Sequence, residues 1–270
     1  MSNENAVNTI AKIAVVTGGS RGLGRNTVLS LATRGVHSIF TYNSNRAEAD
    51  KLITEVTETG AKAIALQLDA GKISTFDPFM KSVAAALVEM GAKRFDYLVN
   101  NAGTSHHAPF DKVTEEDFDS LYNVHFKGVF FLTQKLLPLI NDGGRIVMIS
   151  SGLARFAFPG SSAYASMKGA VEVLTRYLAK ELGPRGIAVN TVAPGAIATD
   201  FSGGMVRDNP AVNKQITNLT ALGRVRVPDD IGPMIASLLS EENRWLNAQR
   251  IEVSSPCEDF GLSLLHSCLL

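Results

Sequence analysis

The sequence predicts an α/β protein: a three-layer, doubly wound parallel sheet of about seven strands. Short apolar runs rich in β-branched residues alternate with longer helix-like segments, the pattern of a parallel sheet covered on both faces. Right-handed crossovers between such strands produce the doubly wound arrangement. No linker, repeat or low-complexity tract divides the chain, so we expect residues 1–270 to form a single domain.

The elements follow one another in a regular order. The strand-like segments are residues 12–17, 37–42, 61–68, 95–100, 145–150, 187–192 and 250–254. Helix-like periodicity fills the connections near residues 22–34, 46–59, 73–90, 115–139, 163–182 and 229–240. The longest irregular stretch runs from Pro194 to about Pro228. Because connections of this length in compact domains are often functional lids, we expect residues 195–227 to form a substrate loop.

The composition favours a globular protein of the cytoplasm. Hydrophobic residues make up 45% of the chain and the formal net charge is zero, so nucleic acid and anionic membranes are poor candidates as partners. No apolar run approaches the ~20 residues of a membrane span. Residues 1–10, an N-terminal extension, lack the features of a secretion signal. The two cysteines, Cys257 and Cys268, indicate no disulfide framework.

A glycine-rich loop follows the first strand directly. Its glycines have the spacing Gly-x-x-x-Gly-x-Gly, which permits a tight turn and the close approach of a ligand. The next helix presents free N–H groups and its positive dipole end, as in Rossmann-type nucleotide sites, so we expect a pyrophosphate there. The alternative is a turn that binds nothing. The residues expected at the phosphates are Gly18, Ser20, Arg21, Gly22, Leu23 and Gly24.

The end of the second strand favours NADP(H) over NAD(H). NAD sites usually place an acid there, on the ribose 2′-hydroxyl, but residues 41–47 contain no acid. The groups placed to hold a 2′-phosphate are Arg21, Asn43, Ser44 and Arg46. The alternative is that both arginines are solvated surface residues. After the third strand, Asp69 either accepts from the adenine amino group or caps a helix, and Ala70 follows it along the cofactor.

Tyr164 and Lys168 are four positions apart in a helix-like segment, so their side chains share one face. We expect the cation to lower the pKa of the phenol from about 10 and to make it a proton donor or acceptor near neutral pH. For this pair alone, the surface of an ordinary amphipathic helix is the alternative.

These motifs resemble the short-chain dehydrogenase/reductase family, in its single-domain form, over roughly residues 10 to 254. The resemblance rests on Thr17–Gly24, Asn100-Asn-Ala-Gly103, Ser151, Tyr164-x-x-x-Lys168 and Pro194-Gly195, which occur in the order and at the spacings of the family. Within the family, the chain looks most like reductases of 3-oxoacyl thioesters and similar ketones. The resemblance implies an NADPH-dependent enzyme that reversibly reduces a ketone or aldehyde to an alcohol, as a homo-oligomer, either tetramer or dimer.

The resemblance also implies the role of each residue. Tyr164 gives its proton to the developing alkoxide, and Ser151 hydrogen-bonds the substrate oxygen. Lys168 lowers the tyrosine pKa and holds the nicotinamide ribose. Asn123 anchors a water of the proton relay or satisfies backbone groups at a helix kink. The cofactor is expected along Asn101, Ala102, Gly103, Pro194, Gly195, Ile197 and Thr199, while Asn100 and Ser150 are structural.

Several remaining features carry weaker expectations. His106 and His107 lack a nearby cysteine or acid cluster, so we expect a surface loop rather than a metal site. Trp245 is expected to pack near the last strand. Residues 255–270 form an atypical tail without a family counterpart, which puts the pocket floor and the oligomer contacts in doubt. Four apolar residues form either a substrate wall or core: Phe156, Phe158, Phe201 and Met205.

Two other functions were weighed against a reductase. A non-catalytic NADP(H)-binding sensor or scaffold is possible on the same fold, because a fold does not secure a function. The joint presence of Asn123, Ser151, Tyr164 and Lys168 disfavours it. A sugar epimerase or dehydratase of the extended relatives would carry a longer C-terminal substrate domain.

Overall fold

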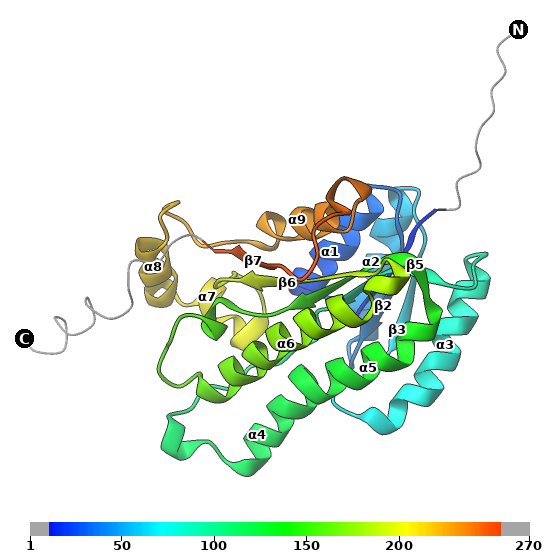
Figure 1. Ribbon diagram of the computed structural model, residues 1–270. Helices are drawn as coiled ribbons and strands as arrows, with labels where there is room; N and C mark the ends of the chain where they lie inside the picture. Colours follow the sequence, from blue (N-terminus) through cyan, green and yellow to red (C-terminus); the bar gives the residue numbers. More distant parts are fainter. Residues whose placement is uncertain (1–10, 255–270) are drawn as a thin grey trace, which may run out of the picture.

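The computed structural model describes residues 11–254 and shows one parallel sheet between two layers of helices (Figure 1). The strand order is β3-β2-β1-β4-β5-β6-β7 and all neighbouring strands are parallel, which confirms the predicted doubly wound sheet. The strands are β1 Ile13–Val16, β2 His37–Tyr42, β3 Ala63–Gln67, β4 Phe95–Asn100, β5 Ile140–Ile149, β6 Ala188–Pro194 and β7 Arg250–Val253.

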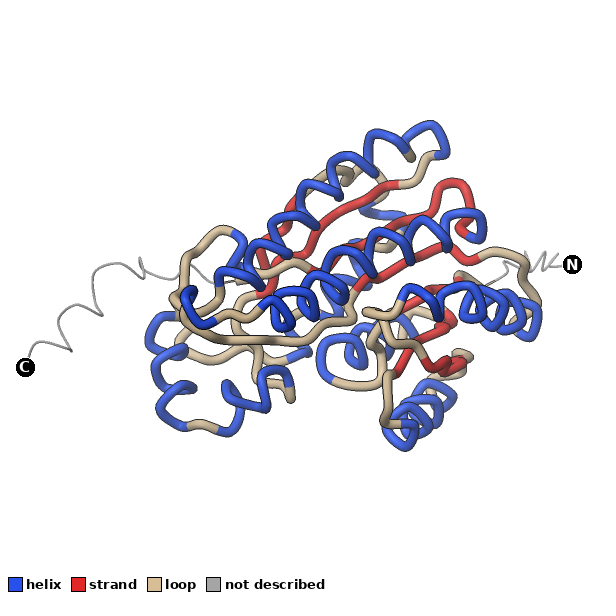
Figure 2. Tube along the Cα trace, turned by 90° about the horizontal axis from the view of Figure 1, so that it is seen from below, coloured by secondary structure: helices blue, strands red, loops and turns tan. Residues whose placement is uncertain are grey.

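Helices cover both faces of the sheet, as Figure 2 shows from a second direction. The helices are α1 Gly22–Ala32, α2 Arg46–Glu58, α3 Phe76–Glu89, α4 Glu115–Tyr122, α5 Gly128–Leu136, α6 Ser162–Glu181, α7 Met205–Asp208, α8 Pro210–Leu219 and α9 Gly232–Leu238. Residues from α1, α2 and α9 belong to one buried cluster, and residues from α3, α5 and α6 belong to the other.

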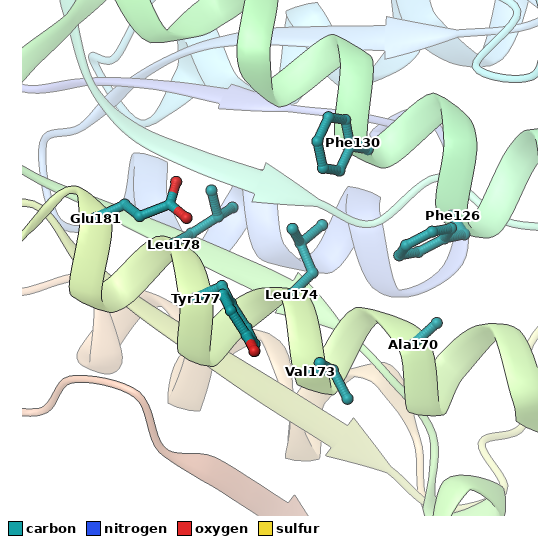
Figure 3. Close-up of a pocket in the computed structure, with 8 residues that line it drawn as sticks. All are labelled: Phe126, Phe130, Ala170, Val173, Leu174, Tyr177, Leu178 and Glu181. Atoms are coloured by element: carbon teal, nitrogen blue, oxygen red, sulfur yellow. The ribbon is translucent and has the colours of Figure 1, made fainter.

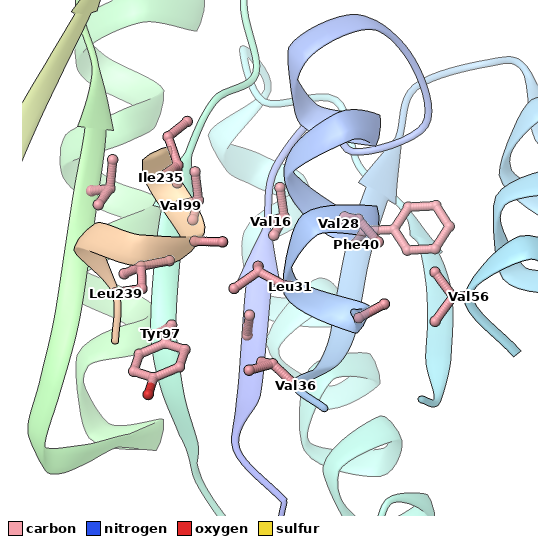
Figure 4. Close-up of a cluster of buried hydrophobic side chains, with 14 of the residues drawn as sticks. Val16, Val28, Leu31, Val36, Phe40, Val56, Tyr97, Val99, Ile235 and Leu239 are labelled. Atoms are coloured by element: carbon pink, nitrogen blue, oxygen red, sulfur yellow. The ribbon is translucent and has the colours of Figure 1, made fainter. Parts of the chain in front are cut away.

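The core lies between the sheet and these two helical layers. On one face, Val28 and Leu31 of α1 and Ile235 of α9 belong to the same buried cluster as Val16 and Val99 of the central strands (Figure 4). Strand β4 is buried at every position, as expected for a central parallel strand with helices on both sides. Each fully buried aliphatic side chain contributes about 1.5–3 kcal/mol, so this core fixes the edge of the sheet from which the site is built.

The segment expected to be irregular, residues 195–227, contains the short helices α7 and α8, so that expectation was wrong. Helix α8 begins with a strong local signal. The Asn209 side chain accepts hydrogen bonds from the backbone N–H groups of Ala211 and Val212, and Pro210 occupies the first helical turn. This segment is therefore largely helical, and its role as a substrate loop remains a prediction.

The helix expected over residues 115–139 is divided by a π-helical turn, Asn123–Lys127, between α4 and α5. The residue that follows this turn is Gly128, and no side chain would fit there. A Cβ at this position would lie 2.0 Å from the carbonyl oxygen of Ala70. The wider turn lets the chain pass close to the loop after β3. Such turns are frequent at functional sites.

Trp245 is 93% exposed, so the expectation that it packs near the last strand was wrong. The two residues that follow it make hydrogen bonds to β6 instead. The Leu246 carbonyl accepts a hydrogen bond from Asn190, and the Asn247 side chain accepts one from the Val189 backbone. These contacts join the turn to β6 through residues 246 and 247.

Two predicted segments, the N-terminal extension at residues 1–10 and the tail at 255–270, lie outside the described residues. Within the range 11–254, no helix combines the length and the apolar character needed to cross a membrane.

Candidate active site

The predicted site residues follow the carboxyl ends of parallel strands, so the fold gathers them at one edge of the sheet. Strand β1 pairs with β2 on one side and with β4 on the other. The order of the strands reverses at this point, and open α/β sheets bind ligands in the crevice outside such a switch point. The glycine loop follows β1, Asn101 follows β4, Ser151 follows β5 and Gly195 follows β6.

The glycine loop is held tightly against the segment after β4. Gly18 has φ +61°, and a Cβ there would lie 2.9 Å from the Cα of Ala102, so this position requires glycine. The Asn101 side chain donates to the carbonyls of Thr17 and Gly18 at 2.9 and 3.0 Å. Asn101 therefore braces the loop with its side chain, and its backbone N–H donates to the Thr17 hydroxyl at 2.9 Å, so its contact with the cofactor remains a prediction.

The start of α1 fits a pyrophosphate. Arg21 occupies the N-cap position with extended backbone, and no side chain caps the helix, so the first N–H groups are open to a ligand. Beside it lies a polar cavity of about 250 Å³, shared by Gly22 with Thr199 and Asp200 of the loop after β6. Of the residues predicted after β6, Thr199 thus lines this cavity together with Gly22, whereas Ile197 packs against the buried cluster.

The turn after β2, residues 43–47, contains one arginine and no acid, and the glycine loop with Arg21 is bonded to the end of this strand through Gly19 and Thr41. Glu48, the first acid after the strand, is paired with Lys51 at 2.7 Å. The exposed Arg46 donates to Asp50 at 2.7 Å, and its guanidinium lies 5.8 Å from the centre of the Tyr42 ring. Arg21 is exposed too, as are Asn43 and Ser44. The composition of this edge suits a phosphate rather than a ribose hydroxyl.

Asp69 caps its own turn, since its carboxylate accepts a hydrogen bond from the Gly71 N–H at 2.9 Å. The side chain is exposed at the end of β3. Its contact with an adenine, and that of Ala70 with the cofactor, remain predictions.

Three predicted catalytic residues meet at the start of α6. Tyr164 lies in its first turn, and its phenol hydrogen-bonds the hydroxyl of Ser151. Lys168, one turn further, lies with its ammonium 5.6 Å from the centre of the Tyr164 ring. The same ammonium donates to the carbonyl of Ile149 at 2.7 Å, which fixes its position under the end of β5.

The predicted effect of Lys168 on the Tyr164 pKa was wrong for the protein without a ligand. Burial raises the pKa of Tyr164 to about 12, and the hydrogen bond with Ser151 lowers it only in part. Burial also lowers the pKa of Lys168 to about 8, because its charge is taken out of water. The raised tyrosine pKa keeps the phenol protonated, which is the form that can give a proton to a substrate oxygen.

Asn123 is the first residue of the π-helical turn, and it lies next to the loop after β3. Its Cβ is 3.8 Å from the place that a Cβ on Gly71 would take, and its carbonyl accepts from the Gly128 N–H. Among residues 11–254, no hydrogen bond joins its side chain to Ser151, Tyr164 or Lys168. The kink is therefore satisfied by the backbone, and the relay role of Asn123 remains a prediction.

His125, two positions further, was missed by the sequence reasoning. It is 1% exposed, and its ring meets the Tyr164 ring in a T-shaped contact with centroids 5.1 Å apart. The available signal was a single histidine within the apolar segment 121–132. Taken alone, such a histidine is more often a satisfied core residue than a functional one.

A second set of residues missed by the sequence reasoning forms a hydrogen-bond network with Ser150 and Ser151. Ser150 donates to Glu172 at 2.7 Å, in keeping with its expected structural role. Arg250 of β7 donates to Glu172 and Glu252 at 2.7 and 2.6 Å, and to the Ser151 carbonyl at 3.4 Å. Because Arg250 is 78 positions from Glu172, no local sequence signal could reveal this network.

One of the four apolar residues considered above lies beside Tyr164. The Phe201 ring lies 6.3 Å from that of Tyr164, and the Phe158 ring lies 6.0 Å from that of His107. Phe158, Phe201 and Met205 are exposed by 40%, 42% and 54%, so these three are not core. His106 pairs with Asp117 at 3.4 Å, and no candidate metal cluster occurs between residues 11 and 254.

Asn100, expected to be a structural brace, is buried and donates to Thr133 of α5 at 3.0 Å and to the sulfur of Met148 at 3.2 Å. It therefore joins β4 to α5 and to β5. Pro194 is buried at the end of β6, paired in register with Val253. A Cβ on Gly195 would lie 2.6 Å from the Arg226 guanidinium, so this glycine is required by close packing rather than by its φ.

Comparisons with known proteins agree with this geometry. A family model described as enoyl-(acyl carrier protein) reductase matches residues 18–255. The hydroxynaphthalene reductase-like protein Arp2 of Metarhizium brunneum is 35% identical over 261 residues, 93% of this chain and 96% of that protein. The angucycline C-6 ketoreductase LanV with bound NADP is 33% identical with a TM-score of 0.87, over 92% and 96% of the two chains. A short-chain dehydrogenase/reductase from Serratia marcescens BCRC 10948 is 30% identical with a TM-score of 0.84, over 91% and 98%.

Proposed function

Since the chain belongs to the short-chain dehydrogenase/reductase family, we propose that it is an NADP(H)-dependent reductase that converts a ketone or aldehyde into an alcohol. The observation that carries this proposal is the hydrogen-bonded pair of Ser151 and Tyr164, with Lys168 one helical turn away. The pair lies at the edge of the sheet that also holds the glycine loop. The NADP bound to LanV supports the choice of cofactor.

Ser151, Tyr164 and Lys168 each have a distinct role in the proposed reaction. The nicotinamide cofactor, when bound, supplies the hydride. Ser151 and Tyr164 direct their hydroxyls at the substrate oxygen, where negative charge develops, and such preorganised donors usually make the largest catalytic contribution. Tyr164 then gives its proton to that oxygen. Lys168 is cationic at neutral pH, since its pKa is about 8, and stabilises the phenolate that remains.

We expect the double variant Arg21→Ala/Arg46→Ala to weaken NADPH binding by about 10- to 100-fold. NADH binding should change by less than about threefold, because only NADPH carries the 2′-phosphate that two guanidiniums can hold. Fluorescence titration with both cofactors measures the two Kd values. Arg34→Ala, an exposed arginine at the other end of α1, is the matched control. Equal losses for NADPH and NADH would contradict the assignment of these arginines.

Within this function, we propose flat aromatic ketones as the substrate class. The support is the exposed aromatic surface of Phe201, whose ring lies 6.3 Å from that of Tyr164 and can stack on a planar ring. Hydroxynaphthalene and angucycline, the aromatic compounds named for Arp2 and LanV, are of this kind. Reduction of 3-oxoacyl thioesters is the other candidate, since the matching family model is described as an enoyl-(acyl carrier protein) reductase.

The decisive experiment is a panel of bicyclic aromatic ketones, quinones, sugars and 3-oxoacyl thioesters, followed by NADPH oxidation. We expect the highest kcat/KM for the bicyclic ketones. A preference for the thioesters would replace the aromatic class. If the protein bound NADPH but reduced nothing in the panel, the non-catalytic sensor would become the better description.

The homo-oligomer is proposed on the basis of an apolar groove between α5 and α6 (Figure 3). It is lined by Phe126, Phe130, Ala170, Val173, Leu174, Tyr177, Leu178 and Glu181. Val173 and Tyr177 are exposed by 44% and 64%, and exposed apolar surface of this kind marks interaction sites. We expect sedimentation velocity to show a dimer or tetramer whose assembly is weakened by Val173→Glu. A wild-type monomer at micromolar concentration would contradict this.

A further inference from the structure

His125 connects three parts of the site. It lies in the π-helical turn, and its ring makes the T-shaped contact with Tyr164 of α6, with an interplanar angle of 83°. Its Nε2 lies 2.7 Å from the carbonyl oxygen of Thr104, in the loop after β4. A Cβ on Gly103 would lie 2.8 Å from the imidazole Cε1, so the loop fits against the ring only because residue 103 is glycine.

The shorter of two contacts decides the tautomer of this imidazole. Nε2 is 2.7 Å from the Thr104 carbonyl and 3.2 Å from the Thr104 N–H, and these contacts require opposite roles for the same nitrogen. The 2.7 Å contact makes Nε2 the donor. Nδ1 then carries a lone pair and is an acceptor. This buried Nδ1 finds no hydrogen-bond partner within the part of the chain that the structure describes.

The surroundings of the ring keep it neutral. Burial and the nearby Lys168 cation lower the pKa of His125 to about 3, whereas the hydrogen bond with Thr104 raises it slightly. The imidazole therefore cannot exchange protons with Tyr164 at neutral pH. Its possible contributions are shape and an acceptor lone pair.

Given the reductase function proposed above, we propose that His125 is a positioning residue of the reaction. Its ring holds the phenol ring of Tyr164 in place, and its Nδ1 accepts a hydrogen bond from a hydroxyl or water that arrives with the bound cofactor. A buried acceptor without a donor is costly, so a ligand that brings a donor gains affinity by satisfying it. A Cβ on Gly103, which is on the predicted cofactor path, would lie 3.4 Å from Nδ1, and this closeness to the path supports this ligand.

Two variants test the contribution of the His125 ring and the contribution of its nitrogens separately. His125→Phe keeps a ring beside Tyr164 and removes both nitrogens, so the Kd for NADPH should rise about tenfold and kcat should fall about 10- to 100-fold. His125→Asn keeps a donor and an acceptor in a smaller side chain. It should restore the Kd to within about threefold of wild type, while kcat remains low because Tyr164 loses its neighbouring ring.

His37→Phe is the matched control. His37 is a partly buried histidine whose pKa is also lowered by burial, and it accepts from the Lys62 N–H at the amino end of β2, the opposite end of the strand from the site. This variant should keep the wild-type Kd and kcat. If His125→Phe stays within twofold of wild type in both constants, the positioning role is overturned.

A measurement on the wild-type protein covers the case in which His125→Phe does not fold. The ¹⁵N shift of Nδ1 should move upfield when NADPH is added, because the nitrogen gains a hydrogen bond. An unchanged shift in the NADPH-saturated protein overturns the inference. This readout needs no turnover, so it separates failure of the inference from failure of the reductase function, which would appear as an inactive wild type.

Discussion

Tyr164→Phe is expected to lower kcat for ketone reduction by about 10²- to 10⁴-fold while NADPH binding changes by less than about threefold. The variant removes one oxygen, which is both the proton source and a donor at the substrate oxygen. It leaves the ring, its contact with His125 and the glycine loop in place. Single-turnover kinetics with saturating NADPH, together with a fluorescence titration, measure the two effects separately.

Tyr177→Phe is the control for this change. Tyr177 lies on the same helix, more than three turns after Tyr164, and its side chain is 64% exposed. Its kcat should equal that of the wild type. A Tyr164→Phe enzyme with wild-type kcat would mean that another group supplies the proton, and the proposed mechanism would be wrong.

Lys168→Met should have the second largest effect, and it should act in opposite directions on activity and stability. We expect kcat to fall by at least about 10²-fold, because the phenolate left by proton transfer loses its cation. The cofactor-free protein should nevertheless melt at a higher temperature at pH 7. Lys168 is 5% exposed, and the buried charge costs free energy that methionine does not.

The sign and the pH window of this stability change follow from the two pKa values. Burial lowers the pKa of Lys168 from its ordinary value of 10.5 to about 8, which costs about 3 kcal/mol at pH 7. Between pH 8 and 10.5 the unfolded chain holds a proton that the folded chain has released, so the free energy of unfolding rises with pH in that window. Loss of the hydrogen bond to Ile149 offsets about 1 kcal/mol.

Thermal unfolding without NADPH, at pH 7 and at pH 9.5, measures this effect. The Tm advantage of Lys168→Met over wild type should shrink at the higher pH, because wild-type Lys168 is then largely neutral. Lys180→Met, an exposed lysine on the same helix, should show no such dependence. An equal Tm difference at both pH values would contradict the lowered pKa of Lys168.

Much of the fold was predictable because its signals are local. Apolar strand segments, glycines and helical periodicity predict the doubly wound sheet, and the structure confirms it. Motif order also predicted Ser151, Tyr164 and Lys168, which the structure brings together. The helix at 205–208 escaped prediction because it is a single turn that follows two glycines, and the helix at 210–219 was missed although Asn209 and Pro210 mark its start.

The sequence by itself determined the strands, the glycine loop and the four-residue spacing of Tyr164 and Lys168, because backbone geometry within one element follows from nearby residues. Tertiary structure decided which distant residues meet: His125 lies against Tyr164, and Arg250 reaches Glu172 and Ser151. It also decided the direction of the pKa shifts. A pKa depends on how much water the fold removes, and for Tyr164 that loss outweighs its neighbours and keeps the phenol protonated.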